Sequence, residues 1–170
     1  MKGILHRLLF ALFAIGFVLT TSKCKQDPET ALADVTVEVT AEGPLYEGSN
    51  TAVGIWKVDL AQLFPEIDFG KTKIKSARIE EVILDFDPSF KVKAAKVEIS
   101  GRNVDMQKIA FANNIGENES SVKLLVAEEQ KGIEKFLQLD AVNVVTDVDL
   151  AEDLETDFSA VVKFKISINY

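Results

Sequence analysis

The sequence predicts a mainly β domain, an antiparallel β-sandwich of seven or eight strands with one or two short helices. Two observations indicate this fold class. Short runs in which apolar and polar residues alternate recur along the chain, and this period of two is typical of half-buried strands. Clusters of Gly, Pro, Asn and Asp separate these runs at regular spacing. One domain over residues 34–170 is long enough to bury a core without disulfides.

Two runs show the strand pattern with particular clarity. Residues 35–40 place valine at every second position, and residues 158–169 place Phe164, Ile166 and Ile168 on one face and lysines on the other. Within residues 74–86 the apolar parity switches, which predicts a β-bulge near Glu80 and Glu81. The full set of predicted strands is 34–40, 51–58, 74–86, 92–100, 107–112, 121–127, 141–148 and 158–169.

Two short helical segments are expected between the strands. Residues 59–64 begin with Asp59, a good helix N-cap, and end before Pro65, so they predict a single capped turn. Residues 132–139 carry apolar side chains three and four positions apart, which favours a helix.

The first 23 residues predict a secretory signal peptide. Residues 1–7 hold Lys2 and Arg7 and no acid, residues 8–19 are an unbroken apolar run, and residues 20–22 are small. Because the apolar run has 12 residues and a membrane-spanning helix needs about 20, we expect cleavage and export rather than a retained anchor.

Cys24, the single cysteine of the chain, follows this leader directly. The segment ending at Cys24 resembles a bacterial lipoprotein box, in which the cysteine thiol is acylated, although Lys23 stands where the box has a small residue. The alternative is cleavage after Ser22, which leaves Cys24 as a free thiol. Lipidation explains a lone cysteine in an exported chain better. We expect residues 24–33 to form a flexible tether.

The exported chain is acidic and contains no histidine. Cleavage of residues 1–23 would take away three basic residues, no acid and the single histidine, His6. The remaining chain has 16 basic and 27 acidic residues, a net charge of −11. This charge argues against nucleic-acid binding. Without an imidazole, Ser-His-Asp and Cys-His catalysis and catalytic zinc sites are excluded. Paired-carboxylate chemistry remains, but no motif marks an acid pair, so we expect no enzyme and no cofactor.

Three features are candidates for a binding site. Seven acids and no base lie between Phe136 and Val162, and Asp147, Asp149 and Asp153 are weak candidates for Ca²⁺ ligands. The motif is incomplete, because Ala151 and Glu152 occupy the places of a ligand and of glycine in an EF-hand loop. We therefore predict no metal and favour a solvated loop.

The other two candidates are a lysine face and an aromatic platform. Lys71, Lys73 and Lys75 alternate, as on one face of a strand that meets an anionic lipid or polysaccharide, or on an edge strand that lysines protect from pairing. Trp56 is the single tryptophan; it is a candidate platform for a sugar ring, although a core position is the more common use.

Residues 74–84, 97–100, 108–110, 136–137 and 161–168 resemble a loose family of uncharacterised small β-rich lipoproteins and secreted proteins of Gram-negative bacteria. The resemblance extends from Ile74 onward, just over half of the chain, and these segments carry it. It implies an extracytoplasmic β-rich domain and brings no catalytic residues.

Together these observations predict a lipid-anchored extracytoplasmic module that binds a partner or has a structural role. We expect it at the cell envelope, on the periplasmic or surface face of the outer membrane, or secreted if Cys24 is not acylated. Its expected partners are the membrane, through the lipid, and an envelope protein or glycan. One alternative is a surface carbohydrate-binding or adhesive lipoprotein that uses Trp56 or the lysine face. A weaker one is a small outer-membrane β-barrel, because the final strand ends in Tyr170.

Overall fold

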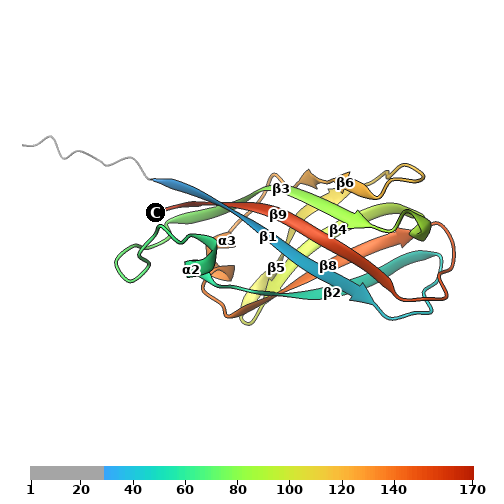
Figure 1. The fold of residues 1–170 in the computed structure, drawn as a ribbon, viewed down its shortest axis with the longest axis horizontal. Coiled ribbons are helices and arrows are strands. Elements are labelled where there is room, and N and C mark those ends of the chain that lie inside the picture. The colour runs from blue at the N-terminus through green and yellow to red at the C-terminus, as the bar shows by residue number, and fades with distance from the viewer. Residues whose placement is uncertain (1–28) are drawn as a thin grey trace, which may run out of the picture.

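The computed structural model describes residues 29–170, which form nine antiparallel strands and three short helical segments (Figure 1). The predicted signal peptide, Cys24 and residues 24–28 of the predicted tether lie outside the described residues. The elements are β1 (Thr30–Ala41), β2 (Gly48–Lys57), α2 (Leu60–Leu63), β3 (Ser76–Phe86), the 3-10 turn η1 (Pro88–Phe90), β4 (Val92–Gly101), β5 (Val104–Ala112), β6 (Ser121–Lys123), β7 (Leu125–Val126), α3 (Ile133–Phe136), β8 (Ala141–Leu150) and β9 (Phe158–Asn169). No helix among the described residues has the length and apolar character needed to cross a bilayer.

The strand order is β6-β3-β9-β1-β2-β8-β4-β5-β7. The strands form two layers, β6-β3-β9-β1 and β2-β8-β4-β5-β7, with the core between them. Pairing is nested, because β1 pairs with β9, β2 with β8, β3 with β6 and β4 with β5. This nested pairing is the connectivity of a jelly roll, a β-sandwich built from two Greek keys. The predicted β-sandwich is therefore confirmed.

The two layers are joined at both sides, so the sheet is nearly closed. On one side β1 and β2 meet at the register pair Thr40–Val53. On the other side the segment from β6 to β7 pairs first with β3 and then with β5, and Leu124 between them is buried. Closure of this kind leaves few unpaired strand edges.

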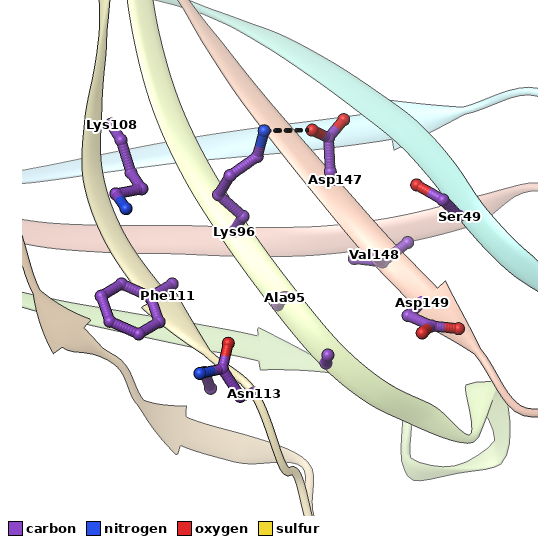
Figure 2. Close-up of a pocket in the computed structure, with 11 residues that line it drawn as sticks. Ser49, Ala95, Lys96, Lys108, Phe111, Asn113, Asp147, Val148 and Asp149 are labelled. Carbon is purple, nitrogen blue, oxygen red and sulfur yellow. Dashed lines mark ion pairs between the residues drawn. The ribbon is translucent and has the colours of Figure 1, made fainter.

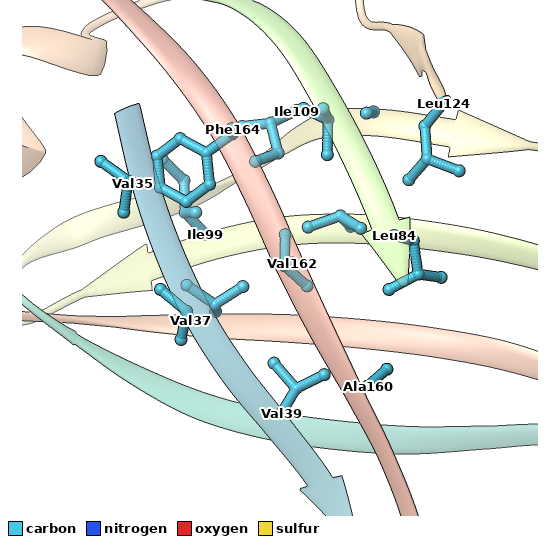
Figure 3. Packing of buried hydrophobic residues seen from close by; sticks show 14 of the residues in the cluster. Val35, Val37, Val39, Leu84, Ile99, Ile109, Leu124, Ala160, Val162 and Phe164 are labelled. Carbon is cyan, nitrogen blue, oxygen red and sulfur yellow. The ribbon is translucent and has the colours of Figure 1, made fainter. Parts of the chain in front are cut away.

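The core is the space between the layers, and it is apolar (Figure 3). Val35, Val37 and Val39 of β1 point into it, as the alternation predicts, and so does Phe164 of β9. Across the layers, the rings of Phe164 and Trp56 pack edge to face at 5.3 Å. Burial of these alternating faces is the main force that holds the layers together.

Several local predictions are confirmed. The register of β3 against β9 shifts between Ile79 and Glu81, where the bulge is expected. The Asp59 side chain accepts a hydrogen bond from the Gln62 amide and caps α2. Residues 158–169 form one strand with the predicted inner and outer faces.

Other boundaries differ from the predictions. Strand β1 begins at Thr30, so the last four residues of the predicted tether pair with β9. Residues 121–127 form two strands instead of one, because the segment changes partner at Leu124. The helix predicted over 132–139 is the single turn of α3, since the apolar side chains of Ile133 and Phe136 need only that turn to reach the core.

Gln130 completes the exposed edge of β3. Its side-chain oxygen accepts from the Ile79 amide at 2.7 Å, and its side-chain nitrogen donates to the Ile79 carbonyl at 2.9 Å. One amide side chain thus takes the place of a neighbouring strand at this residue.

Candidate functional site

The outer face of β2, β8, β4 and β5 carries a shallow hollow of about 440 Å³ (Figure 2). It lies toward the ends of β8 and β2 that meet at the pair Gly48–Leu150, far from Thr30, where the described chain enters the sandwich. The hollow combines an aromatic ring, charged groups and small polar side chains. Its lining includes Ser49, Ala94, Lys96, Phe111, Asp147 and Asp149.

Strand register explains the shape of the hollow. Thr51, Asp147, Lys96 and Phe111 are successive register partners on β2, β8, β4 and β5, and the last two of these side chains are long. In the neighbouring row Ser49 pairs with Asp149 and Asp149 with Ala94, so the side chains there are short. The floor is low at Ala94 because a methyl group stands where the next row has a lysine.

Two β-bulges determine which side chains of β4 and β5 point outward into the hollow. The register of β4 against β8 shifts between Val92 and Ala94, and this shift turns Ala94 outward. In β5 both Ile109 and Ala110 are buried, and the register against β4 shifts there. As a result Lys108 and Phe111 lie on the same outer face, with the Lys108 Nζ 4.9 Å from the centre of the Phe111 ring. Bulges often reorient side chains beside functional sites.

The charges inside the hollow are held in pairs. Lys96 Nζ lies 2.9 Å from both Asp147 Oδ2 and Glu98 Oε2. The hydrogen bonds to Asp147 and Glu98 raise the pKa of Lys96. Burial tends to raise the pKa of Asp147, but hydrogen bonds from Thr51 and Lys96 outweigh it and hold that pKa below its ordinary value. Both groups therefore stay ionised near neutral pH.

A second ion pair borders the hollow. Lys93 Nζ lies 3.3 Å from Asp149 Oδ1 and 3.7 Å from Glu47 Oε1. Lys108 makes no ion pair among the described residues, and its ammonium group lies over Phe111 instead. The face thus offers fixed hydrogen-bonding groups around one apolar ring.

The acidic candidates do not form a metal site. Asp147 and Asp149 both lie on β8, which extends two residues beyond the predicted strand, and each contacts a lysine. Asp153, in the loop after β8, accepts a hydrogen bond from the Glu47 amide at 2.7 Å. Over residues 29–170 no group of three His, Cys, Asp or Glu side chains is placed to bind a metal ion.

The lysine face predicted on a strand is wrong. Lys71, Lys73 and Lys75 precede β3 in a loop, because the strand starts only at Ser76. Lys71 pairs with Asp68 at 3.0 Å, and Lys75 Nζ donates to the Tyr170 carbonyl at 2.8 Å. The three lysines therefore lie in a loop and do not share one face of the sheet.

The core position of Trp56 is confirmed, and the alternative of an aromatic platform is wrong. The side chain of Trp56 is 5% exposed and packs against Phe164, so no ring face is open to a sugar. The half-buried ring in a hollow is that of Phe111, which sequence patterning did not single out. Only the bulge in β5 turns Phe111 outward, and the sequence around it reads as ordinary strand.

Comparison with known proteins adds little to this geometry. No protein-family model and no curated protein matches the chain. A solved structure from desmodium yellow mottle tymovirus aligns over 89% of this chain and 93% of its own, with 7% sequence identity and a TM-score of 0.31.

Proposed function

We propose that the chain is a lipid-anchored extracytoplasmic binding module, acylated at Cys24, that holds its ligand without chemical conversion. The observation that carries the proposal is the hollow on the outer face of β2, β8, β4 and β5, with its aromatic ring and paired charges. Its volume falls in the range of small-ligand sites, about 300–1,000 Å³.

The position of the hollow supports an anchored role. Strand β1 begins at Thr30, five residues after Lys25, and its 12 residues span about 40 Å. The hollow lies toward the end at which Gly48 of β2 pairs with Leu150 of β8. Figure 1 shows that β1 begins at one end of the sandwich and that β8 ends at the other. A lipid on Cys24 would therefore hold one end at the membrane and leave the hollow accessible.

The carboxyl groups support binding rather than hydrolysis. A glycosidase acid needs a raised pKa so that it stays protonated. Among the described residues, every carboxyl group with a shifted pKa is shifted downward: Glu81, Asp85, Asp87 and Asp147.

Metabolic labelling with an alkyne analogue of palmitate tests the anchor. We expect the full chain to incorporate the label and to fractionate with membranes, and Cys24→Ala to lose both properties. Phe111→Ala is the matched control and should keep both. Label that persists in Cys24→Ala contradicts acylation at this residue.

A second candidate is a surface adhesive lipoprotein that binds carbohydrate. Phe111 favours it, because its half-buried ring lines the hollow and aromatic rings suit stacking against a sugar. Cells that carry the chain should adhere to immobilised polysaccharide, and cells with Cys24→Ala should not. Equal adhesion by both strains argues against this candidate.

A further inference from the structure

We infer that the ligand of this face is a linear, uncharged oligosaccharide that crosses β5 over Phe111 and occupies a hollow on each side of it. The inference rests on the proposed binding function and names its ligand class. Three observations carry it: a second hollow, the charge arrangement and the placement of Phe111.

The second hollow lies on the other side of Phe111. It has a volume of about 390 Å³ and is lined by Lys108, Phe111, Ala127, Glu128 and Glu129. Lys108 and Phe111 also line the first hollow, so these two side chains form a ridge between them. A ligand with one ring fills one hollow, whereas a chain of rings can fill both and cross the ridge.

The charges around the hollows disfavour an anionic polymer. Three lysines, Lys93, Lys96 and Lys108, stand against four carboxylates around the first hollow: Glu47, Glu98, Asp147 and Asp149. Glu128 and Glu129 add acid at the second hollow. A polyanion would meet these acids and a mature chain of net charge −11, both of which repel it.

The same groups suit hydroxyls. Each paired carboxylate keeps lone pairs that accept a hydrogen bond, and the Lys108 ammonium keeps donor hydrogens because it has no ion pair among the described residues. The Phe111 ring between them offers an apolar surface to the C–H groups of a sugar. Polar groups on both sides of an aromatic ring thus match the alternation of hydroxyls and C–H faces along a glycan.

Calorimetry with the full lipidated chain in mild detergent tests the inference. The ligands are neutral oligosaccharides of one to six units, built from glucose, xylose, mannose or N-acetylglucosamine, with oligogalacturonates as the anionic series. For at least one neutral series we expect no measurable binding of the single sugar and an affinity at least tenfold higher for four units than for two. The anionic series should not bind.

Three variants locate the ligand. Phe111→Ala removes the ridge and should weaken the longest neutral ligand at least tenfold. Ala94→Tyr fills the first hollow and should remove the gain in affinity with chain length. Asn143→Tyr places the same ring on the outer face of β8, outside both hollows, and should bind as the wild type does. The fluorescence of Trp56 confirms that each variant is folded.

Several outcomes overturn the inference: binding of no neutral oligosaccharide, an affinity independent of length, binding of the anionic series alone, or unchanged affinity in both Phe111→Ala and Ala94→Tyr. Acylation at Cys24 is measured separately. If the chain is acylated but binds no neutral oligosaccharide, the proposed ligand class is wrong and the anchored module stands. If Cys24 is not acylated, the proposed anchor is wrong, whichever ligand binds.

Discussion

Replacement of Gly54 by alanine should destabilise the fold markedly, although alanine usually suits a strand better than glycine does. Gly54 faces inward on β2 where β1 crosses it, next to the pair Thr40–Val53. A Cβ at this position would overlap the Glu38 carbonyl oxygen and lie 3.0 Å from both the Glu38 carbonyl carbon and Val37 Cγ1. Carbon atoms in contact are normally about 3.5–4.0 Å apart, so β1 must move away from β2.

We expect a loss of about 2–3 kcal/mol in the free energy of unfolding, the upper part of the range for overpacked sites. For a domain of this size that loss lowers Tm by roughly 6–10 °C. Guanidinium unfolding followed by Trp56 fluorescence measures it. The control is Ile55→Thr, because Ile55 is the next residue, faces outward and is 64% exposed; its effect should stay within about 0.5 kcal/mol. A Gly54→Ala variant as stable as the wild type would refute the close approach of β1 and β2.

Three further predictions concern other parts of the sandwich. Asp147→Asn should lower the free energy of unfolding at pH 7. The difference from the wild type should shrink as the pH falls below 3.8 and through the lowered pKa of Asp147, because the stability that comes from a lowered carboxyl pKa is lost when the carboxyl group is protonated. A pH series of urea unfolding measures this difference, and a difference that grows toward acid contradicts the prediction. Gln130→Ala should cost about 1–3 kcal/mol, because it removes three side-chain hydrogen bonds, two with Ile79 and one to the Ala127 carbonyl. It should also speed amide exchange at Ile79, and unchanged protection there would contradict the edge contact. Trp56→Ala should lower the free energy of unfolding by about 3–5 kcal/mol, measured by calorimetric melting. A variant that keeps its stability but loses glycan binding would contradict the core position of Trp56.

Sequence reasoning identified the fold class because its signals are local. Alternation places Val35, Val37 and Val39 inward on any half-buried strand, whichever strand lies beside it. The bulge at Glu80 and Glu81 was also visible, because the apolar parity switches within one strand. These patterns depend on neighbours one to four residues away and need no knowledge of the partners.

The sequence pattern failed where tertiary pairing decides the outcome. Residues 121–127 look like one strand, but the segment divides at Leu124 because β3 and β5 lie in different layers. The alternation of Lys71, Lys73 and Lys75 resembles a strand face, yet β3 starts only at Ser76. Of these three lysines, Lys75 alone has an amide that donates to β9, at the Asn169 carbonyl. Periodicity alone does not say whether a segment has a partner.

The candidate site could not be predicted from the sequence, because it too depends on tertiary pairing. Ser49, Ala94, Phe111 and Asp147 are spread over about a hundred residues, and only the pairing of four strands unites them. That pairing follows from the core, since each strand must turn its apolar side chains inward. The bulges in β4 and β5 then change which residues remain outside, and so expose Ala94 and Phe111. The hollow is therefore a product of two register shifts on the solvent face.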